Sequence, residues 1–249
     1  MATDDPSYAP GYGQVSHHEW RTAENSAGFL LPTLQSMARS NPHLTLLDVG
    51  CGSGTITAGL AAYMPHGRIT ALDLSPDILA RARRVAEGRG VTTIDFQQGS
   101  VYALPFPDRS FDVVHASMVT VHLADPLRAF REMLRVAKPG GVVADRESDL
   151  RMWSVHPDSE GMRDFHRFIC DQHVKSGGTL DLAPKMVGLA LQAGASRAKI
   201  QMGMGTWTYS TPAERRMWGE RSILLSSSWF FFAFSFILLL RDDVERISC

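Results

Sequence analysis

The stretch LLDVGCGSGTITA, residues 46–58, places an acid and three glycines where a short apolar run ends. Asp48 precedes Gly50, Gly52 and Gly54, and apolar residues then resume at helical spacing. This pattern predicts a strand, a tight turn and a helix, and in an open parallel sheet a ligand can touch the backbone at such a turn. A plain turn usually needs only one glycine, so three glycines favour a bound ligand over a purely structural turn.

The spacing of the glycines indicates the kind of ligand. A dinucleotide fingerprint, G-x-G-x-x-G, needs its third glycine at position 55, where this chain has Thr55. The observed G-x-G-x-G therefore favours a smaller adenosyl ligand that has no pyrophosphate. Asp73 ends the next apolar run, about 20 residues further on, where an acid can accept hydrogen bonds from two ribose hydroxyls. Helix capping is the alternative role of Asp73, but Ser75 already fills the capping position.

A histidine just beyond the fourth expected strand is the best-placed candidate for proton transfer. His122, in VTVHLADP, could accept a proton from a hydroxyl or an acidic carbon of an acceptor, although lone histidines are also common as loop or packing residues. Glu147, at the exit of the fifth strand, is a weaker candidate. His115 lies in mid-strand and is expected to be packed. The weakest candidates are His17 and His18.

The elements that position these residues alternate between strand and helix. Nearly continuous apolar strands in this order predict an α/β fold with a doubly wound, mostly parallel sheet. The expected strands cover residues 44–49, 68–74, 93–99, 111–117 and 140–147, with a further strand at 198–209. The expected helices cover residues 17–39 in two pieces, 54–64, a segment from 75, 126–138, 158–175 and 181–193. In the first of these, Asn25 or Ser26 is expected as a cap before AGFLLPTLQSMAR, and Pro32 is expected to bend or restart the helix.

Four segments together resemble a known family. LLDVGCGSG, ALDLS, GSVYALPFPDRSFDVVHAS and EMLRVAKPGG are similar to the successive motifs of class I S-adenosylmethionine-dependent methyltransferases. The chain most resembles the group that includes the ubiquinone and menaquinone biosynthesis methyltransferases and many small-molecule methyltransferases. The resemblance extends roughly from Tyr12 to Tyr209. It implies a Rossmann-like, seven-stranded sheet, an N-terminal helical lid and S-adenosyl-L-methionine as the cofactor.

The resemblance also implies roles for individual residues. Asp48 would orient the glycine turn, Gly50 and Gly52 would bring the backbone to the methionine half of the cofactor, and Asp73 would hold the ribose. The other implied cofactor contacts are Leu74 on the adenine, Ser100 and Val101 beside it, Ser117 at the methionine moiety, Arg21 at the carboxylate and Tyr12 over the sulfonium. Relatives commonly have an aspartate at the position of Ser100, so we expect a weaker adenine contact there. An exposed helix with ordinary pairing of Arg21 to Glu24 is the alternative.

Composition excludes several other classes of function. The chain has 249 residues, 25 basic and 26 acidic, and no basic tract, so nucleic acid is not an expected partner. Its three cysteines, Cys51, Cys170 and Cys249, are far apart in the sequence, which argues against a disulfide framework or a metal site and favours the cytoplasm.

We expect a flexible arm at 1–15, a methyltransferase domain at 16–221 and an atypical apolar segment at 222–249. The last segment has no charged residue from Ser222 to Leu240, 19 positions. Three interpretations stay open: a final antiparallel strand, a membrane anchor, which is less favoured, and an aberrant extension that replaces part of the acceptor lid. The oligomeric state is left open.

These observations favour methyl transfer from S-adenosylmethionine to a small apolar or aromatic metabolite, quinone-like or a secondary metabolite. The segment MRDFHRFICDQH and the cluster Met202, Met204 and Trp207 would line the acceptor pocket, although simple core packing is the alternative. Two other functions remain as hypotheses. One is a catalytically silent methyltransferase-like binding protein, and the other is an NAD(P)-dependent oxidoreductase, which the glycine spacing disfavours.

Overall fold

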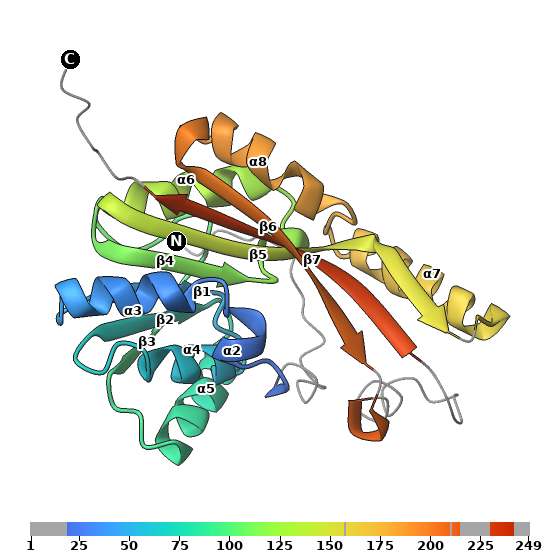
Figure 1. Ribbon diagram of the computed structural model, residues 1–249, viewed down its shortest axis with the longest axis horizontal. Coiled ribbons are helices and arrows are strands. Elements are labelled where there is room, and N and C mark those ends of the chain that lie inside the picture. The colour runs from blue at the N-terminus through green and yellow to red at the C-terminus, as the bar shows by residue number, and fades with distance from the viewer. Residues whose placement is uncertain (1–18, 157, 210, 215–229, 242–249) are drawn as a thin grey trace.

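The computed structural model describes residues 19–156, 158–209, 211–214 and 230–241, the last range by its backbone (Figure 1). Tyr12, His17 and His18 lie outside the described residues. The strands form one sheet in the order β3-β2-β1-β4-β5-β7-β6. Their bounds are β1 Thr45–Val49, β2 Arg68–Asp73, β3 Ile94–Gln98, β4 Phe111–Ser117, β5 Ala137–His156, β6 Ile200–Tyr209 and β7 Phe230–Arg241.

The first five strands are parallel, and β7 lies antiparallel between β5 and β6. The order reverses between β1 and β4, so the carboxyl ends of these two strands form the switch point at which ligands bind in open α/β sheets. The expected Rossmann-like α/β architecture is confirmed. The glycine turn after β1 lies at this switch point.

Helices cover both faces of the sheet, with α6 and α8 on one side and α3, α4 and α5 on the other (Figure 1). Two apolar clusters correspond to these faces, one containing Phe130 of α6 and Met186 of α8, the other Leu34 of α3 and Leu60 of α4. Full burial of such a side chain contributes about 1.5–3 kcal/mol. The helices are α2 Ala23–Ser26, α3 Leu31–Ser40, α4 Thr55–Ala61, α5 Pro76–Gly88, α6 Pro126–Val136, α7 Glu160–Lys175 and α8 Leu182–Gln192, with two 3₁₀ turns, η2 Thr120–His122 and η3 Arg197–Lys199.

The first described helices belong to the core. The helix restarts at Pro32, as expected, because Pro32 lies in the first turn of α3. The prediction of Asn25 or Ser26 as the cap of this helix is wrong, since Leu30 occupies that position without a side-chain hydrogen bond, and Thr22 caps the short helix α2. The Thr22 hydroxyl accepts from the Asn25 amide while the Asn25 side chain accepts from the Thr22 amide, a capping box that needs its hydroxyl at the earlier position. Ala23 and Leu30 are fully buried beside α4 and the sheet. The described continuation of the expected N-terminal lid therefore packs as core.

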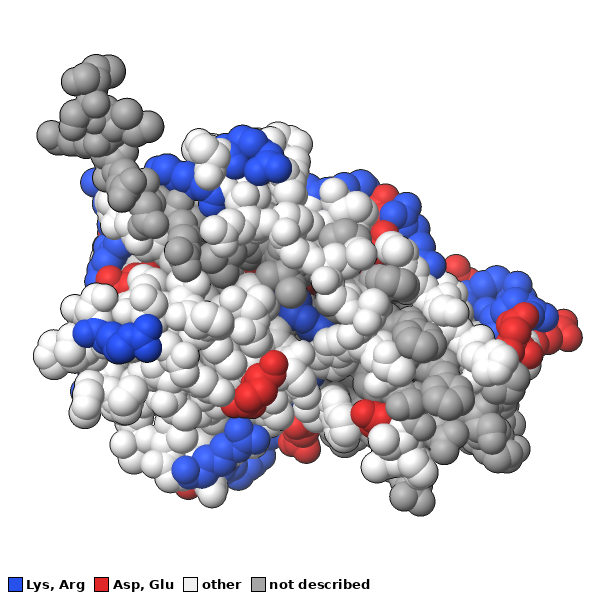
Figure 2. Space-filling model, viewed as in Figure 1, with Lys and Arg blue, Asp and Glu red and all other residues white. Residues whose placement is uncertain are grey.

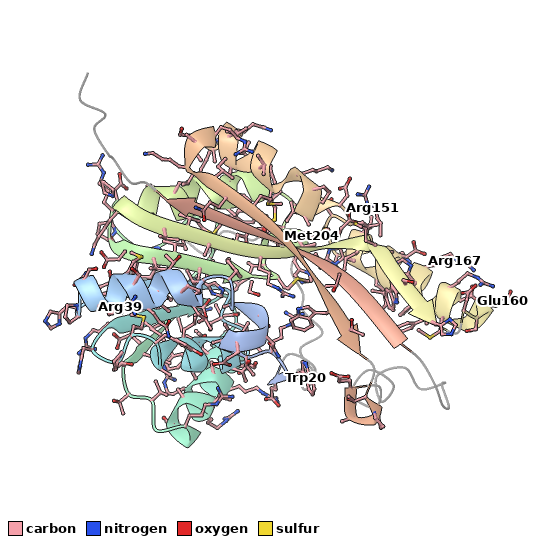
Figure 3. All side chains as sticks on the ribbon, in the orientation of Figure 1. Trp20, Arg39, Arg151, Glu160, Arg167 and Met204 are labelled. Carbon is pink, nitrogen blue, oxygen red and sulfur yellow. The ribbon has the colours of Figure 1, made fainter. Side chains whose placement is uncertain are left out.

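The carboxyl-terminal half of β5 extends the sheet beyond the other parallel strands. It continues to His156, well past the expected end at 147, because β7 pairs with it on both sides of an irregularity between Ser148 and Trp153. Helix α7 lies along this extension, where Figure 3 labels Arg151, Glu160 and Arg167. Figure 2 shows basic and acidic side chains next to one another at this end of the molecule. The apolar segment near the carboxyl terminus thus supplies a strand, which is the first of its three interpretations. Within the described residues, no helix combines the length and apolar character needed to cross a bilayer.

Candidate functional site

The three glycines of the turn after β1 all have left-handed backbone conformations, with φ of 64° at Gly50, 54° at Gly52 and 76° at Gly54. At Gly50 an added Cβ would lie 2.6 Å from the Val119 side chain, and at Gly54 it would lie 2.8 Å from the Ala82 Cβ. At Gly52 an added Cβ would meet nothing within 4 Å. Internal packing therefore explains two of the glycines, and only Gly52 faces space that a ligand could fill.

Asp73 joins this turn to the next strand. Its Oδ2 accepts from the Gly52 amide at 3.1 Å and its Oδ1 accepts from the Ser75 amide at 3.0 Å, while the side-chain oxygen of Ser75 caps α5. Burial raises the pKa of Asp73, although its backbone hydrogen bonds oppose that shift. Each carboxylate oxygen has a second lone pair, which a hydroxyl beside Gly52 can use. Leu74, 44% exposed, offers an apolar surface next to it.

Asp48 lies beneath the turn and is fully engaged within the protein. Its Oδ2 accepts from the Thr57 hydroxyl of α4, and its Oδ1 lies 2.7 Å from the His115 Nδ1 of β4. Asp48 is 3% exposed and His115 is fully buried. These contacts tie β1, β4 and α4 together behind the glycines and confirm that His115 is packed in mid-strand. Asp48 can orient the turn without touching a ligand.

The remaining expected cofactor contacts lie at the exits of β3 and β4. The Ser100 hydroxyl accepts from the Tyr102 amide at 3.2 Å, so it holds its own loop and keeps its proton free to donate. The Val101 side chain is buried in the core, which leaves its backbone as the group able to meet a ligand. The Ser117 Oγ is buried and has no hydrogen-bond partner among the described residues. A buried hydroxyl without a partner is costly unless a ligand satisfies it.

His122 ends the 3₁₀ turn η2, which follows β4. Its ring centroid lies 4.9 Å from that of His173 in α7. Burial, together with the charges of His173 and Arg21, lowers the pKa of His122 to about 3. His122 is therefore neutral at physiological pH, so one of its two ring nitrogens carries no proton.

Two arginines flank one indole near His122. The Arg146 guanidinium lies 4.4 Å from the centroid of the Trp207 ring, and that of Arg21 lies 5.9 Å from it. Glu24, the alternative partner expected for Arg21, accepts from the Tyr63 hydroxyl at 2.9 Å. Met202 and Met204, expected beside Trp207 in an acceptor pocket, are 38% and 61% exposed on β6, where Figure 3 labels Met204. Trp207 instead packs with Trp153, Met162 and Phe165, the last two from the helical segment that was also expected to line the pocket.

Sequence reasoning missed most of the polar groups in the middle of β5, beside the exit of β4. Five consecutive polar residues there are all buried, with exposures between 0% and 5%. They are Asp145, Arg146, Glu147, Ser148 and Asp149. Only Glu147 was a candidate. The available signal was a polar run that directly continues an apolar strand, because such a run must either leave the sheet or be satisfied inside it.

The residues present fit S-adenosylmethionine. An open space lies over Gly52, a carboxylate is held beside it, and a buried hydroxyl at Ser117 has no described partner. The cofactor would lie against the backbone in the open space over Gly52. Its ribose would bind to Asp73, and its methionine half would lie beside Ser117. The described part of the chain contains no group of three His, Cys, Asp or Glu side chains arranged to hold a metal ion.

Known proteins share this architecture and these motifs. A methyltransferase domain model matches residues 47–144. An uncharacterized methyltransferase of Schizosaccharomyces pombe is 33% identical over 230 residues, which are 88% of this chain and 79% of that protein. The demethylmenaquinone methyltransferase of Geobacillus stearothermophilus is 36% identical over 103 residues, 41% of this chain and 44% of that protein.

Among solved structures, the arsenic(III) S-adenosylmethionine methyltransferase of Chlamydomonas reinhardtii superposes with a TM-score of 0.54 at 22% identity. The superposition covers 83% of this chain and 66% of that one. Motifs, fold and relatives agree, which separates the chain from the nicotinamide-dependent oxidoreductases. The chain therefore belongs to the class I S-adenosylmethionine-dependent methyltransferases.

Proposed function

We propose that this methyltransferase methylates a small, partly aromatic metabolite, with His122 as the base. The observation that carries this proposal is a neutral, half-buried imidazole just beyond β4, close enough to Arg21 to feel its charge, while Arg21 itself lies 5.9 Å from the Trp207 ring. A quinone-like or phenolic acceptor matches these groups, because a flat ring can pack on Trp207. One relative is named as a demethylmenaquinone methyltransferase, which supports this class of acceptor.

The cofactor, when bound, supplies an activated methyl group on a sulfonium. The chain itself must then hold the acceptor in line, exclude water and remove a proton. Arg21 makes the potential near His122 more positive, which favours the ionised form of a phenol or enol. The low pKa of His122 keeps its imidazole neutral before the reaction but also makes it a weak base. His122 would therefore take the acceptor's proton at an imidazole nitrogen only together with this stabilisation of the anion.

We assign the cofactor to the glycine-turn side of the switch point. Gly50 and Gly52 supply backbone, Asp73 binds the ribose, and Asp48 orients the turn. The other proposed contacts are Leu74, Ser100, Val101, Ser117, Arg21 and Tyr12. The methyltransferase domain would span 16–221. The expected arm at 1–15 lies outside the described residues, and within the segment 222–249 the described part is the strand β7. Cys51 and Cys170 are free thiols, which fits a reducing compartment such as the cytoplasm.

Transfer of a labelled methyl group to a panel of quinol, phenol and amine acceptors tests the proposal. We expect transfer to quinols or phenols, and His122→Asn should reduce the rate about 100-fold because the base is lost. His66→Asn is the matched control, since His66 is exposed in the loop that precedes β2, at the opposite end of the sheet. Cofactor binding without transfer to any acceptor would favour the silent binding protein, and an unchanged rate in His122→Asn would remove the base assignment.

A further inference from the structure

Two carboxyl groups in the middle of β5 are completely buried and lie on one face of the strand. Asp145 and Glu147 are two residues apart, so both side chains face η2, and neither is exposed to solvent. The Thr120 Oγ1 lies between them, 2.9 Å from Asp145 Oδ2 and 2.9 Å from Glu147 Oε1. The Glu147 Oε1 also accepts from the Val119 amide at 2.8 Å and the Thr120 amide at 2.6 Å.

The number of protons in this chain of contacts is limited. Thr120 has one hydroxyl proton, yet its oxygen lies at hydrogen-bond distance from two carboxyl groups. One carboxyl group must therefore donate. The Glu147 Oε1 already accepts two amide protons, so a further proton on that oxygen would face two N–H groups and is unfavourable. The donor is then Asp145, which gives its proton to Thr120, and Thr120 gives its own to Glu147.

The electrostatic environment agrees with this assignment. Burial, together with the charge of Glu147, raises the pKa of Asp145 well above its ordinary value. Burial also raises the pKa of Glu147, but the hydrogen bonds from Thr120, Val119 and Val121 oppose the shift. Asp145 Oδ1 and Glu147 Oε2 have no hydrogen-bond partner among the described residues.

The loop held by Glu147 connects the two sides of the site. The Val119 side chain occupies the space that a Cβ at Gly50 would need, 2.6 Å away. Ser117, expected at the methionine end of the cofactor, precedes this loop, and His122 ends it. We propose that Glu147 is a positioning residue of the methyl-transfer site, which fixes residues 118–122 against the glycine turn, with Asp145 as its permanently protonated partner through Thr120. This inference rests on the proposed cofactor site but does not depend on the acceptor.

A pair of near-isosteric variants tests both parts. Asp145→Asn keeps an N–H donor toward Thr120, so we expect the affinity for S-adenosylhomocysteine, measured by calorimetry, to stay within about twofold of wild type. Glu147→Gln replaces charge-assisted hydrogen bonds by neutral ones, so we expect about a tenfold loss of affinity. Asp112→Asn is the matched control, because Asp112 also bonds a threonine, Thr45, but at the opposite end of the sheet.

Infrared spectroscopy reads the proton directly. The C=O stretching band of a buried protonated carboxyl group should be present in wild type and Glu147→Gln and absent in Asp145→Asn. The reverse pattern, with Asp145→Asn losing affinity and Glu147→Gln silent, would overturn the proton assignment. Equal, wild-type affinity in both variants would overturn the positioning role.

If Glu147→Gln fails to fold, Thr120→Ser and Thr120→Val provide a second comparison. Thr120→Ser keeps the hydroxyl and should retain affinity, whereas Thr120→Val should lose it, and equal affinities would contradict the proposal. If the wild-type protein does not bind S-adenosylhomocysteine, the proposed cofactor site is contradicted. The infrared band would still show whether Asp145 is protonated.

Discussion

Two pairs of buried carboxyl groups lie at the same edge of the sheet, and they differ in how they are satisfied. On the cofactor side, Asp48 and Asp73 each use both oxygens in contacts with described residues. In β5, Asp145 and Glu147 each leave one buried oxygen without a described partner. The comparison shows that the acids of the glycine turn are satisfied by separate groups of the protein, whereas the acids of β5 share a limited number of protons.

The difference has a physical cause. Asp48 and Asp73 accept from separate donors, the Thr57 hydroxyl, the Gly52 amide and the Ser75 amide. Asp145 and Glu147 instead share one hydroxyl, that of Thr120. Preorganised hydrogen bonds of the first kind hold a cofactor at little cost on binding, because their donors are already in place.

The strongest test of this comparison removes a fully satisfied carboxylate. Asp48→Ala leaves the Thr57 hydroxyl and the His115 ring without their buried acceptor, and each such loss costs about 1–3 kcal/mol, so we expect the free energy of unfolding to fall by about 2–6 kcal/mol. Urea unfolding measures this change. Asp95→Ala, which removes an exposed ion pair with Arg68, is the control and should have no measurable effect. A similar small effect for Asp48→Ala would break the comparison.

The glycine turn provides a pair of variants with opposite readouts. Gly54→Ala combines a left-handed φ with a Cβ 2.8 Å from that of Ala82, so we expect a loss of about 2–4 kcal/mol in unfolding free energy. Gly52→Ala has the same kind of φ but open space, so its stability should fall by only about 1–2 kcal/mol while its affinity for S-adenosylhomocysteine falls more than that of Gly54→Ala. Equal affinities in the two variants would show that no ligand approaches Gly52.

The smallest expected effect is the pH dependence of stability that the buried acid Asp145 of β5 causes. The folded-state pKa of Asp145 is raised, so the stability that its proton provides is complete below the ordinary value of 3.8 and is lost as the pH rises toward the folded pKa. Asp145→Asn cannot titrate. Its stability relative to wild type should therefore increase by about 1 kcal/mol or more between about pH 5 and about pH 7. Urea unfolding at both values measures it, and a difference that does not change with pH would contradict the buried proton.

Much of the fold could be predicted because the strands are buried on both faces and so appear as short apolar runs. The strand at 111–117 has the expected bounds, and Asp48 and Asp73 could be found because each directly follows or ends such a run. The extension of β5 could not be predicted. It contains buried polar residues whose partners lie on η2, and the strand β7 that pairs with it comes from a segment with poor alternation.

The roles of the individual glycines could not be predicted from the sequence either. Three glycines suggested one ligand, but the clashes at Gly50 and Gly54 involve Val119 and Ala82, which are distant in the chain. Only the packing of η2 and α5 against the turn separates these two glycines from Gly52. Local patterns thus identified where the site lies, and long-range packing decided what each residue does there.

The measurement that tests the central claim most directly is the affinity of Asp73→Ala for S-adenosylhomocysteine by calorimetry. A carboxylate that binds ribose hydroxyls contributes about 1.5–3 kcal/mol, so we predict a loss of roughly 10-fold to 100-fold in a variant whose folding is verified by circular dichroism. Asp95→Ala, on the neighbouring strand β3, should bind like wild type. Unchanged affinity in a folded Asp73→Ala sample would contradict the placement of the cofactor at this edge of the sheet.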